Sequence, residues 1–259
     1  MNTTAPLIIK NVHKTYHAEN STVDALVDIN LKVKPGEFVS IVGSSGCGKS
    51  TLLKLIVGLE NHFRGEIRLG DDKIKGTDVD RGMVFQEARL FPWLTVEENI
   101  AFGLVEKLSA KEKKKIVEHH INLVNLNGFA KSYPHQLSGG MQQRTSIARA
   151  LVNNPKILTL DEPFGALDAL TRIQMQQEVL RIWALEKTTM LLVTHDVDEA
   201  IFLGDRIVVM SSRPGTINKI IPVDLPRPRD RNSDEFVKIK KEIYAELFKE
   251  EQEFLDYVI

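Results

Sequence analysis

The stretch Gly43-Ser44-Ser45-Gly46-Cys47-Gly48-Lys49-Ser50 decides the fold of this chain. It matches the pattern G-x-x-x-x-G-K-[ST], and it lies between an apolar run at residues 38–42 and the helix-forming sequence TLLKLI. A phosphate-binding loop joins a strand to a helix in this way, because the helix N-terminus then faces the bound phosphates. The alternative is an ordinary Gly-Ser turn, which the flanking strand and helix disfavour.

The residues of this loop each suit a phosphate-binding role. Its three glycines let the backbone curl, so that successive N–H groups face the β- and γ-phosphates of a nucleotide. Lys49 adds a positive charge, and the Ser50 hydroxyl can ligate Mg²⁺. Cys47 occupies a variable position, where a small filler is the main interpretation and a redox role is the alternative. The predicted nucleotide-binding residues are Gly43, Ser44, Ser45, Gly46, Cys47, Gly48, Lys49, Ser50 and Thr51.

Two acidic residues, Asp161 and Glu162, follow the apolar run at residues 157–160. A phosphate loop needs such an acidic element to hold the metal and to orient water. We expect Asp161 to contact Mg²⁺, directly or through water, and Glu162 to accept a hydrogen bond from the attacking water as general base. The alternative for the pair is a helix N-cap or a solvated turn.

The composition argues against several other classes of protein. The chain has 259 residues, 42% of them hydrophobic and 27% charged, so it can bury the core of one domain with an added subdomain. Its net charge of −1 offers no basic field to nucleic acid. No uncharged stretch approaches the roughly 20 apolar residues of a membrane-spanning helix. The start MNTTAPLIIK lacks the layout of a secretory signal, and a single cysteine cannot form an internal disulfide, so we expect a cytosolic location.

Short apolar runs predict strands, and longer periodic segments predict helices. The strands are predicted at residues 7–9, 29–33, 38–42, 66–69, 82–85, 157–160, 190–193 and 207–210, and the helices at residues 50–59, 169–185 and 196–203. Strands that alternate with helices imply a parallel sheet. From residue 87 to 153 the pattern is helical, with capping boxes at Thr95-x-x-Glu98 and Ser109-x-x-Glu112.

We therefore expect one α/β domain over residues 1–259. Residues 1–86 and 154–225 form its core, residues 87–153 an inserted helical subdomain, and residues 226–259 a C-terminal helical extension. Apolar residues of this extension recur on one face of a helix. They are Phe236, Ile239, Ile243, Leu247, Phe254 and Leu255. Packing on the core is the main interpretation of this stripe, and a regulatory or dimer contact is the alternative.

The sequence Leu137-Ser138-Gly139-Gly140-Met141-Gln142-Gln143-Arg144 resembles the signature motif of ATP-binding-cassette ATPases. Ser138 can cap the helix that follows, and Gly139 and Gly140 leave its N-terminal amides open to a γ-phosphate. The resemblance implies a cassette with an N-terminal antiparallel β subdomain, a parallel-sheet core and an inserted helical subdomain. It also implies a head-to-tail dimer, with a like or a different cassette, that encloses two ATP molecules. Met141 departs from the most frequent family pattern, which has Gln there.

Four further residues match family motifs one at a time. Tyr16 resembles the aromatic that stacks on adenine, and a core tyrosine is its alternative. Gln86 resembles the glutamine that touches Mg²⁺ and water, and Asp168, in Ala166-Leu167-Asp168, matches the loop that crosses the dimer interface. His195 matches the switch histidine that contacts the γ-phosphate, whereas a lone histidine is usually a surface or core residue. By resemblance, Glu162, His195 and Gln86 are the catalytic residues, and Ser50, Gln86 and Asp161 are the metal ligands.

The segment Leu90-Phe91-Pro92-Trp93-Leu94 concentrates apolar residues between polar flanks. Exposed aromatic residues often mark interfaces, so a partner-docking surface is one interpretation and a packed corner of the helical subdomain is the other. This segment, together with Arg213-Pro214-Gly215 and Pro226-Arg227-Pro228-Arg229, looks like the ATPases of bacterial nitrate, sulfonate and taurine importers.

The resemblance thus predicts an ATP-hydrolysing subunit, with ATP and Mg²⁺ as cofactors, that energises a bacterial importer of a small anion or organic solute. Its partners would be membrane permease subunits and an extracytoplasmic solute-binding protein, and it would lie at the cytoplasmic face of the membrane as a peripheral subunit. One alternative is a cassette ATPase that acts outside transport, but such proteins typically carry two cassettes, a long coiled coil or zinc-binding cysteines. A stand-alone P-loop kinase or binding module is another, and the signature motif argues against it.

Overall fold

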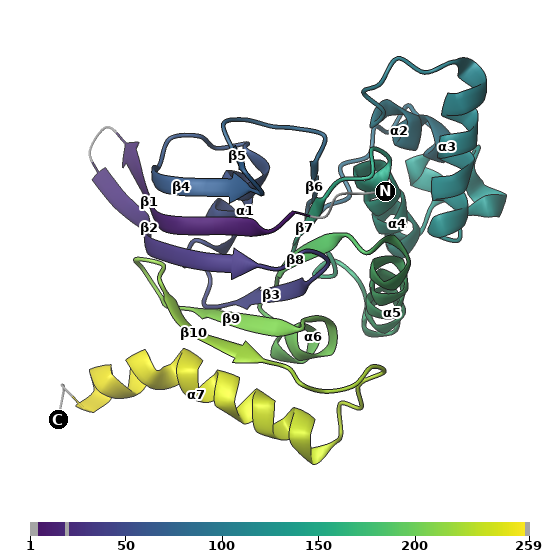
Figure 1. Ribbon diagram of the computed structural model, residues 1–259. Coiled ribbons are helices and arrows are strands. Elements are labelled where there is room, and N and C mark those ends of the chain that lie inside the picture. The colour runs from purple at the N-terminus through teal and green to yellow at the C-terminus, as the bar shows by residue number, and fades with distance from the viewer. Residues whose placement is uncertain (1–4, 19–20, 257–259) are drawn as a thin grey trace. The chain divides into compact units, whose positions relative to one another are not determined.

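The computed structural model describes residues 5–18 and 21–256, which form two compact units (Figure 1). The phosphate-loop unit contains residues 5–76 and 191–256, and the helical unit contains residues 77–190. Strand β8 (Thr189–Val193) begins in the helical unit and ends in the phosphate-loop unit. No helix among the described residues has both the length and the apolar character needed to span a bilayer.

An antiparallel sheet forms the N-terminal part of the phosphate-loop unit. Its strand order is β2 (Ser21–Val33), β1 (Leu7–Ala18), β4 (Arg64–Leu69) and β5 (Asp72–Lys73). This confirms the antiparallel subdomain, but β1 and β2 extend well beyond the predicted strands. The outer end of β2 is exposed on both faces, and bulges interrupt the β1–β2 register, so these residues carry no alternating apolar pattern.

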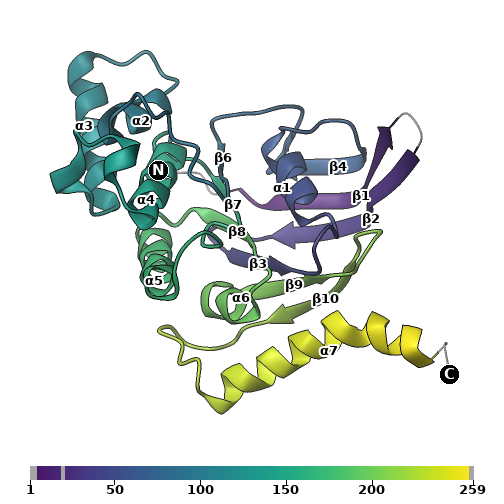
Figure 2. The same cartoon turned by 180° about the vertical axis from the view of Figure 1, so that it is seen from behind.

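A second set of strands in this unit surrounds the phosphate loop. Strand β3 (Phe38–Val42) is buried along its whole length and pairs in parallel with β9 (Arg206–Met210). Helix α1 (Lys49–Val57) follows the loop, and α6 (Val197–Leu203) packs against β3. The edge strand β10 (Ile217–Pro222) pairs antiparallel to β9 (Figure 2). The sequence did not predict this strand, because Asn218 and Lys219 interrupt its run of isoleucines.

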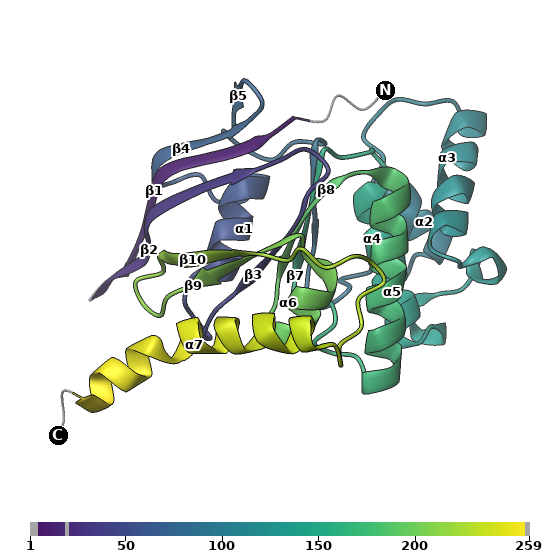
Figure 3. The same ribbon diagram turned by 60° about the horizontal axis from the view of Figure 1, so that its bottom comes forward.

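The C-terminal helix α7 (Asp234–Asp256) lies along α6, β9 and β10 (Figure 3). Phe236 and Ile243 of its apolar stripe are fully buried, which confirms that the stripe packs on the core of this unit. Ion pairs of Lys240 with Asp198 (2.7 Å) and of Lys219 with Glu242 (2.9 Å) flank the contact. The side chains of Phe254 and Leu255 lie outside the described residues.

The helical unit combines two parallel strands with most of the helices. Strand β6 (Arg81–Val84) pairs in parallel with β7 (Ile157–Asp161). The α-helices are α2 (Val96–Phe102), α3 (Ala110–Leu123), α4 (Gly139–Leu151) and α5 (Ala169–Glu186), with two short 3₁₀ helices, η1 (Asn127–Phe129) and η2 (Pro134–Gln136). Both predicted capping boxes are present, at the starts of α2 and α3.

The boundaries between the two compact units lie at residues 76/77 and 190/191, whereas the predicted subdomain boundaries lie at 86/87 and 153/154. Helix α4 packs against both β6 and α5, so within the helical unit these elements share one core. The subdomain boundaries therefore stay a prediction.

The Pro226–Arg229 motif has a structural role in the phosphate-loop unit. The buried Arg229 guanidinium donates hydrogen bonds to the carbonyls of Ile201, Phe202 (3.3 Å) and Gly204 (2.6 Å) at the C-terminal end of α6, and Nη2 donates to Val223 (3.1 Å). The carbonyls at the end of α6 have no partner within the helix, so a cation near the helix C-terminus satisfies them. Burial lowers the pKa of Arg229 to about 10, and the group therefore stays charged at neutral pH.

We predict that Arg229→Met lowers the free energy of unfolding by about 3 kcal/mol, because several buried carbonyls lose their donor. Urea denaturation followed by circular dichroism measures the change. Lys238→Met, which removes a cation from an exposed position of α7, is the matched control and should change stability by less than about 0.5 kcal/mol. Equal stability of the two variants would contradict the assigned role of Arg229.

Candidate functional site

The phosphate loop turns sharply at its glycines. Gly46 and Gly48 have φ angles of +76° and +98°, which side-chain-bearing residues rarely adopt. A Cβ atom at Gly48 would also lie 2.6 Å from the Ala25 carbonyl oxygen. The loop therefore needs glycine at position 48 for both its backbone angle and its close packing on β2.

Lys49 lies inside this loop. Its side chain is 6% exposed, and Nζ donates hydrogen bonds to the carbonyl oxygens of Gly43 and Ser44, each at 2.8 Å. The Cys47 sulfur is buried and lies 3.8 Å from the same Nζ. Burial opposes access of an oxidant to Cys47, so its position fits the small-filler interpretation better than a redox role.

His195 and the phosphate loop line one cleft of the phosphate-loop unit. The cleft has a volume of about 830 Å³ and also includes Tyr244 and Phe248 of α7. Thr194, at the end of β8, donates from its amide to the carbonyl of Ile41 (3.2 Å), which places the exposed His195 beside the end of β3. The structure thus brings together two motifs that are about 150 residues apart in the chain.

Tyr16 is 39% exposed on β1, and Lys14 Nζ lies 4.5 Å from the centre of its ring. This exposure rules out the core-tyrosine alternative. Part of the ring is therefore accessible to a stacking partner, and adenine stacking, which the resemblance implies, stays a prediction.

In the helical unit, Gln86 and the two carboxylates lie at the same end of two neighbouring strands. Val84 of β6 pairs with Leu160 of β7, so Gln86 and Glu162 each follow the C-terminal end of a parallel strand. The Gln86 amide nitrogen lies 3.3 Å from the position that a Cβ atom would take at Gly165, three residues after Glu162. Glu162 has a φ angle of +46°. Strained backbone of this kind concentrates at functional sites, which supports the catalytic interpretation over a solvated turn.

The signature motif begins helix α4. The Ser138 hydroxyl caps this helix by accepting a hydrogen bond from the Met141 amide (3.3 Å), as predicted. Gly139 is exposed, whereas Gly140 is buried against α5, where a Cβ atom would lie 2.7 Å from the Thr171 methyl carbon. Gly140 therefore permits the close packing of α4 on α5, a role that the motif alone did not predict.

Asp168 caps helix α5. Its carboxylate accepts hydrogen bonds from the amides of Leu170 (3.1 Å) and Thr171 (3.0 Å). The hydrogen bonds from Thr171 lower the pKa of Asp168, first through its side chain and then through its amide. The carboxylate is therefore ionised at neutral pH and sets where the helix begins.

Two residues of α4 that sequence reasoning missed hold the segment around Gln86. Gln143 Nε2 donates to the Phe85 carbonyl (3.2 Å), and the Arg149 guanidinium donates to the carbonyls of Ala88 and Arg89, each at 3.0 Å. The signature helix thus anchors the backbone on both sides of Gln86. Only the register of α4 against β6 places these side chains there, so no local pattern could have revealed them.

The aromatic corner of the helical unit is held from inside and exposed outside. Asn99 is fully buried, accepts from the Phe91 amide (2.9 Å), and donates to the carbonyls of Leu94 (2.9 Å) and Thr95 (3.0 Å). Phe91 contacts Trp93 and Phe102 (ring centroids 5.5 and 4.5 Å apart), which are 68% and 64% exposed. We call Phe91, Trp93 and Phe102 the aromatic surface. Its exposure favours the docking interpretation over the packed corner.

Comparison with known proteins places these motifs in one family. Residues 26–165 match the model of the ABC transporter family. The chain is 52% identical over 235 residues to an aliphatic sulfonates import ATP-binding protein, SsuB, of Bacillus cereus, covering 91% of this chain and 93% of that protein. It is 45% identical to the SsuB protein of Bacillus subtilis (strain 168), covering 94% of each. A solved dimeric ATP-binding cassette in a post-hydrolysis state, bound to ADP and phosphate, has a TM-score of 0.73 and 36% identity, covering 85% of this chain and all of that one.

The chain therefore belongs to the ABC transporter family. It is an ATP-binding, ATP-hydrolysing subunit of a solute transporter, with the α/β cassette fold expected from its sequence. ATP is accordingly its nucleotide.

We predict that Gly48→Ala weakens ATP binding about tenfold or more, because an added methyl group combines backbone strain with a clash against Ala25. Titration with a fluorescent ATP analogue measures the dissociation constant. Gly128→Ala is the control, because a Cβ atom at Gly128 meets no atom within 4 Å. Wild-type affinity in Gly48→Ala would show that the loop does not need glycine at this position.

Proposed function

We propose that this chain hydrolyses ATP to drive the import of an aliphatic sulfonate or a related small organic anion. The observation that carries the proposal is its identity of 45–52% to SsuB proteins over at least 91% of the chain, with the phosphate loop, the two carboxylates and the signature motif all present. The import direction and the sulfonate class come from the names of those relatives.

The proposed roles in hydrolysis follow from the chemistry of each side chain. Lys49 and the loop amides bind the β- and γ-phosphates, and Tyr16 stacks on adenine. The Ser50 hydroxyl, the Asp161 carboxylate and the Gln86 amide supply hard oxygen donors, which suit Mg²⁺, and this ion would neutralise charge on the phosphates. Glu162 accepts a proton from the attacking water as general base, while His195 contacts the γ-phosphate.

The signature motif would act on a nucleotide held by a second cassette. Ser138 and the N-terminal amides of α4 form an anion site, and each copy has one phosphate loop and one such helix. Two cassettes arranged head to tail would thus enclose two ATP molecules, with Asp168 at their interface. ATP would close the dimer and pull the membrane subunits with it, and hydrolysis followed by product release would reopen it.

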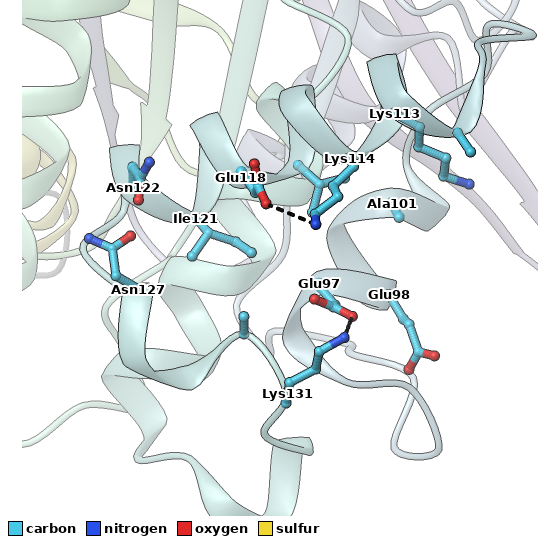
Figure 4. Close-up of a pocket in the computed structure, with 13 residues that line it drawn as sticks. Glu97, Glu98, Ala101, Lys113, Lys114, Glu118, Ile121, Asn122, Asn127 and Lys131 are labelled. Atoms are coloured by element: carbon cyan, nitrogen blue, oxygen red, sulfur yellow. Dashed lines mark hydrogen bonds and ion pairs between the residues drawn. The ribbon is translucent and has the colours of Figure 1, made fainter.

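The aromatic surface is the proposed contact for a permease subunit at the cytoplasmic face of the membrane. Helix α2 also borders a groove of about 690 Å³ against α3, with an apolar floor that includes Ala101 and Ile121 (Figure 4). Ion pairs of Lys131 with Glu97 and of Lys114 with Glu118 (3.8 Å) stand at its rim. A cytoplasmic helix of the permease could cover both features, and an extracytoplasmic binding protein would select the solute.

We predict that Glu162→Gln retains ATP binding but lowers turnover by about 100-fold or more, because the amide cannot accept the proton from water. The trapped nucleotide should then hold the closed dimer, which light scattering detects as a doubled mass with ATP and Mg²⁺. Glu118→Gln, an exposed glutamate of α3, is the control and should hydrolyse ATP at the wild-type rate. A Glu162→Gln protein that stays monomeric with ATP would contradict the two-cassette site.

We also predict that a strain lacking this gene fails to grow on an alkanesulfonate as sole sulfur source but grows on sulfate. The double variant Trp93→Ser/Phe102→Ser should not restore growth, although its purified form hydrolyses ATP, because the docking contact is lost. A variant with Phe129→Ser, which changes an exposed aromatic residue outside the aromatic surface, is the control and should restore growth. Normal growth of the deletion strain on alkanesulfonates would refute the solute class, and full rescue by the double variant would refute the docking surface.

A further inference from the structure

The turn between β9 and β10 is closed by its own hydrogen bonds and packs against the phosphate loop. Residues 211–216 form a closed turn, in which the Ser211 amide donates to the Thr216 carbonyl (3.0 Å) and the Thr216 amide donates to Ser211 Oγ (2.8 Å). Ser211 Oγ also donates to the Pro214 carbonyl (2.9 Å). These bonds hold Arg213, Pro214 and Gly215 in one arrangement, and we call residues 211–216 the brace turn.

Gly215 seats the brace turn between β2 and the phosphate loop. Its amide donates to the Ala25 carbonyl (3.2 Å), and its carbonyl accepts from the Val27 amide (2.9 Å). A Cβ atom at position 215 would lie 2.0 Å from the Cys47 carbonyl oxygen, closer than any side chain allows. The backbone of Gly215 therefore lies directly against the peptide that joins Cys47 to Gly48.

Arg213 contacts the adjacent peptide of the same loop. Its Nε–H donates to the Gly46 carbonyl (3.2 Å), and a Cβ atom at Gly46 would lie 2.7 Å from the Arg213 Nη2 nitrogen. The brace turn thus meets two successive carbonyl groups of the phosphate loop. Strand β10, which follows the brace turn, is held in turn by α7, where Lys219 pairs with Glu242 (2.9 Å) and Glu246 (3.2 Å).

Because each peptide group is planar, the contacts to these two carbonyls also determine where the following N–H groups point. In a trans peptide the C=O group and the following N–H point in opposite directions. A Gly46 carbonyl that faces Arg213 therefore directs the Cys47 N–H away from Arg213 and into the loop. There the Cys47 nitrogen lies 3.4 Å from the Ser44 carbonyl oxygen. The Cys47 carbonyl packs against the Gly215 backbone and cannot rotate past it. The direction of the following Gly48 N–H is therefore fixed as well.

We propose that the brace turn is a positioning element for ATP binding and that Arg213 is its positioning residue. By holding the carbonyls of Gly46 and Cys47 outward, the turn keeps the Cys47 amide on the Ser44 carbonyl, which closes the loop, and directs the Gly48 amide inward, toward the triphosphate. The ordering entropy is then lost on folding and not on binding, which increases affinity without a direct contact to the nucleotide.

Arg213→Ala should raise the dissociation constant of a fluorescent ATP analogue and the KM for ATP about three- to tenfold, the effect of one hydrogen bond of ordinary strength at an exposed position. The value of kcat should stay near that of the wild type, because Arg213 does not act on the reacting water. Arg64→Ala, which removes an exposed arginine of β4 in the same unit, is the matched control and should change neither constant.

Two conservative variants separate hydrogen bonding from charge. Arg213→Gln keeps an amide donor without charge, and Arg213→Lys keeps the charge but loses the Nε–H. If the brace acts through the carbonyl, the glutamine variant restores more affinity than the lysine variant, and the difference persists at high salt. Better rescue by lysine, lost at high salt, would overturn the proposal in favour of simple charge attraction.

The single cysteine provides a readout that does not depend on hydrolysis. Cys47 is buried in the loop that the brace turn contacts, so its reaction with a thiol reagent reports local opening. We expect Arg213→Ala to accelerate labelling in the ATP-free protein at an unchanged melting temperature. Unchanged labelling, or faster labelling at wild-type ATP affinity, would overturn the proposal. The more severe Gly215→Ala should show the same changes if it folds, and Arg213→Ala decides the matter if it does not.

Discussion

Close backbone packing around the phosphate loop is the constraint on which the phosphate-loop unit depends. Gly48 lies against the Ala25 carbonyl, and Gly215 lies against the Cys47 carbonyl, at distances that leave no room for a side chain. Lys49 fills the inside of the loop with two hydrogen bonds to its carbonyls. Because strand β2, the loop and the brace turn interlock in this way, the loop amides have few alternative directions, and the loop is preorganised for a polyphosphate.

The helical unit orders its functional residues by a different means. Long side chains of the signature helix α4 reach the backbone on either side of Gln86, and Asn99 holds the corner that presents Trp93. Buried polar groups of this kind must find partners, so each hydrogen bond fixes a loop that would otherwise have many conformations. The signature motif, the segment around Gln86 and the aromatic surface are thereby parts of one packed structure.

Much of the fold and site could be predicted because its causes are local. The phosphate loop, the helix caps at Thr95, Ser109 and Ser138, and the buried strand β3 depend on residue type and short spacing, and all appear as expected. Strand β10 and the outer ends of β1 and β2 could not be predicted, because partner strands hold them in place and their own apolar pattern is interrupted. The Pro226–Arg229 motif suggested only a family likeness, whereas Arg229 completes the end of α6.

The amino-acid sequence by itself determined the class of chemistry, since a glycine-rich loop with Lys49 and Ser50, followed later by Asp161 and Glu162, specifies phosphate binding through backbone angles and side-chain charge. Only the tertiary structure decided which distant groups support that chemistry. Arg213 reaches Gly46, and Gln143 reaches Phe85, across 167 and 58 positions of the chain. Such contacts depend on strand register and helix packing, which arise from the burial of the whole core and leave no mark on the residues that meet.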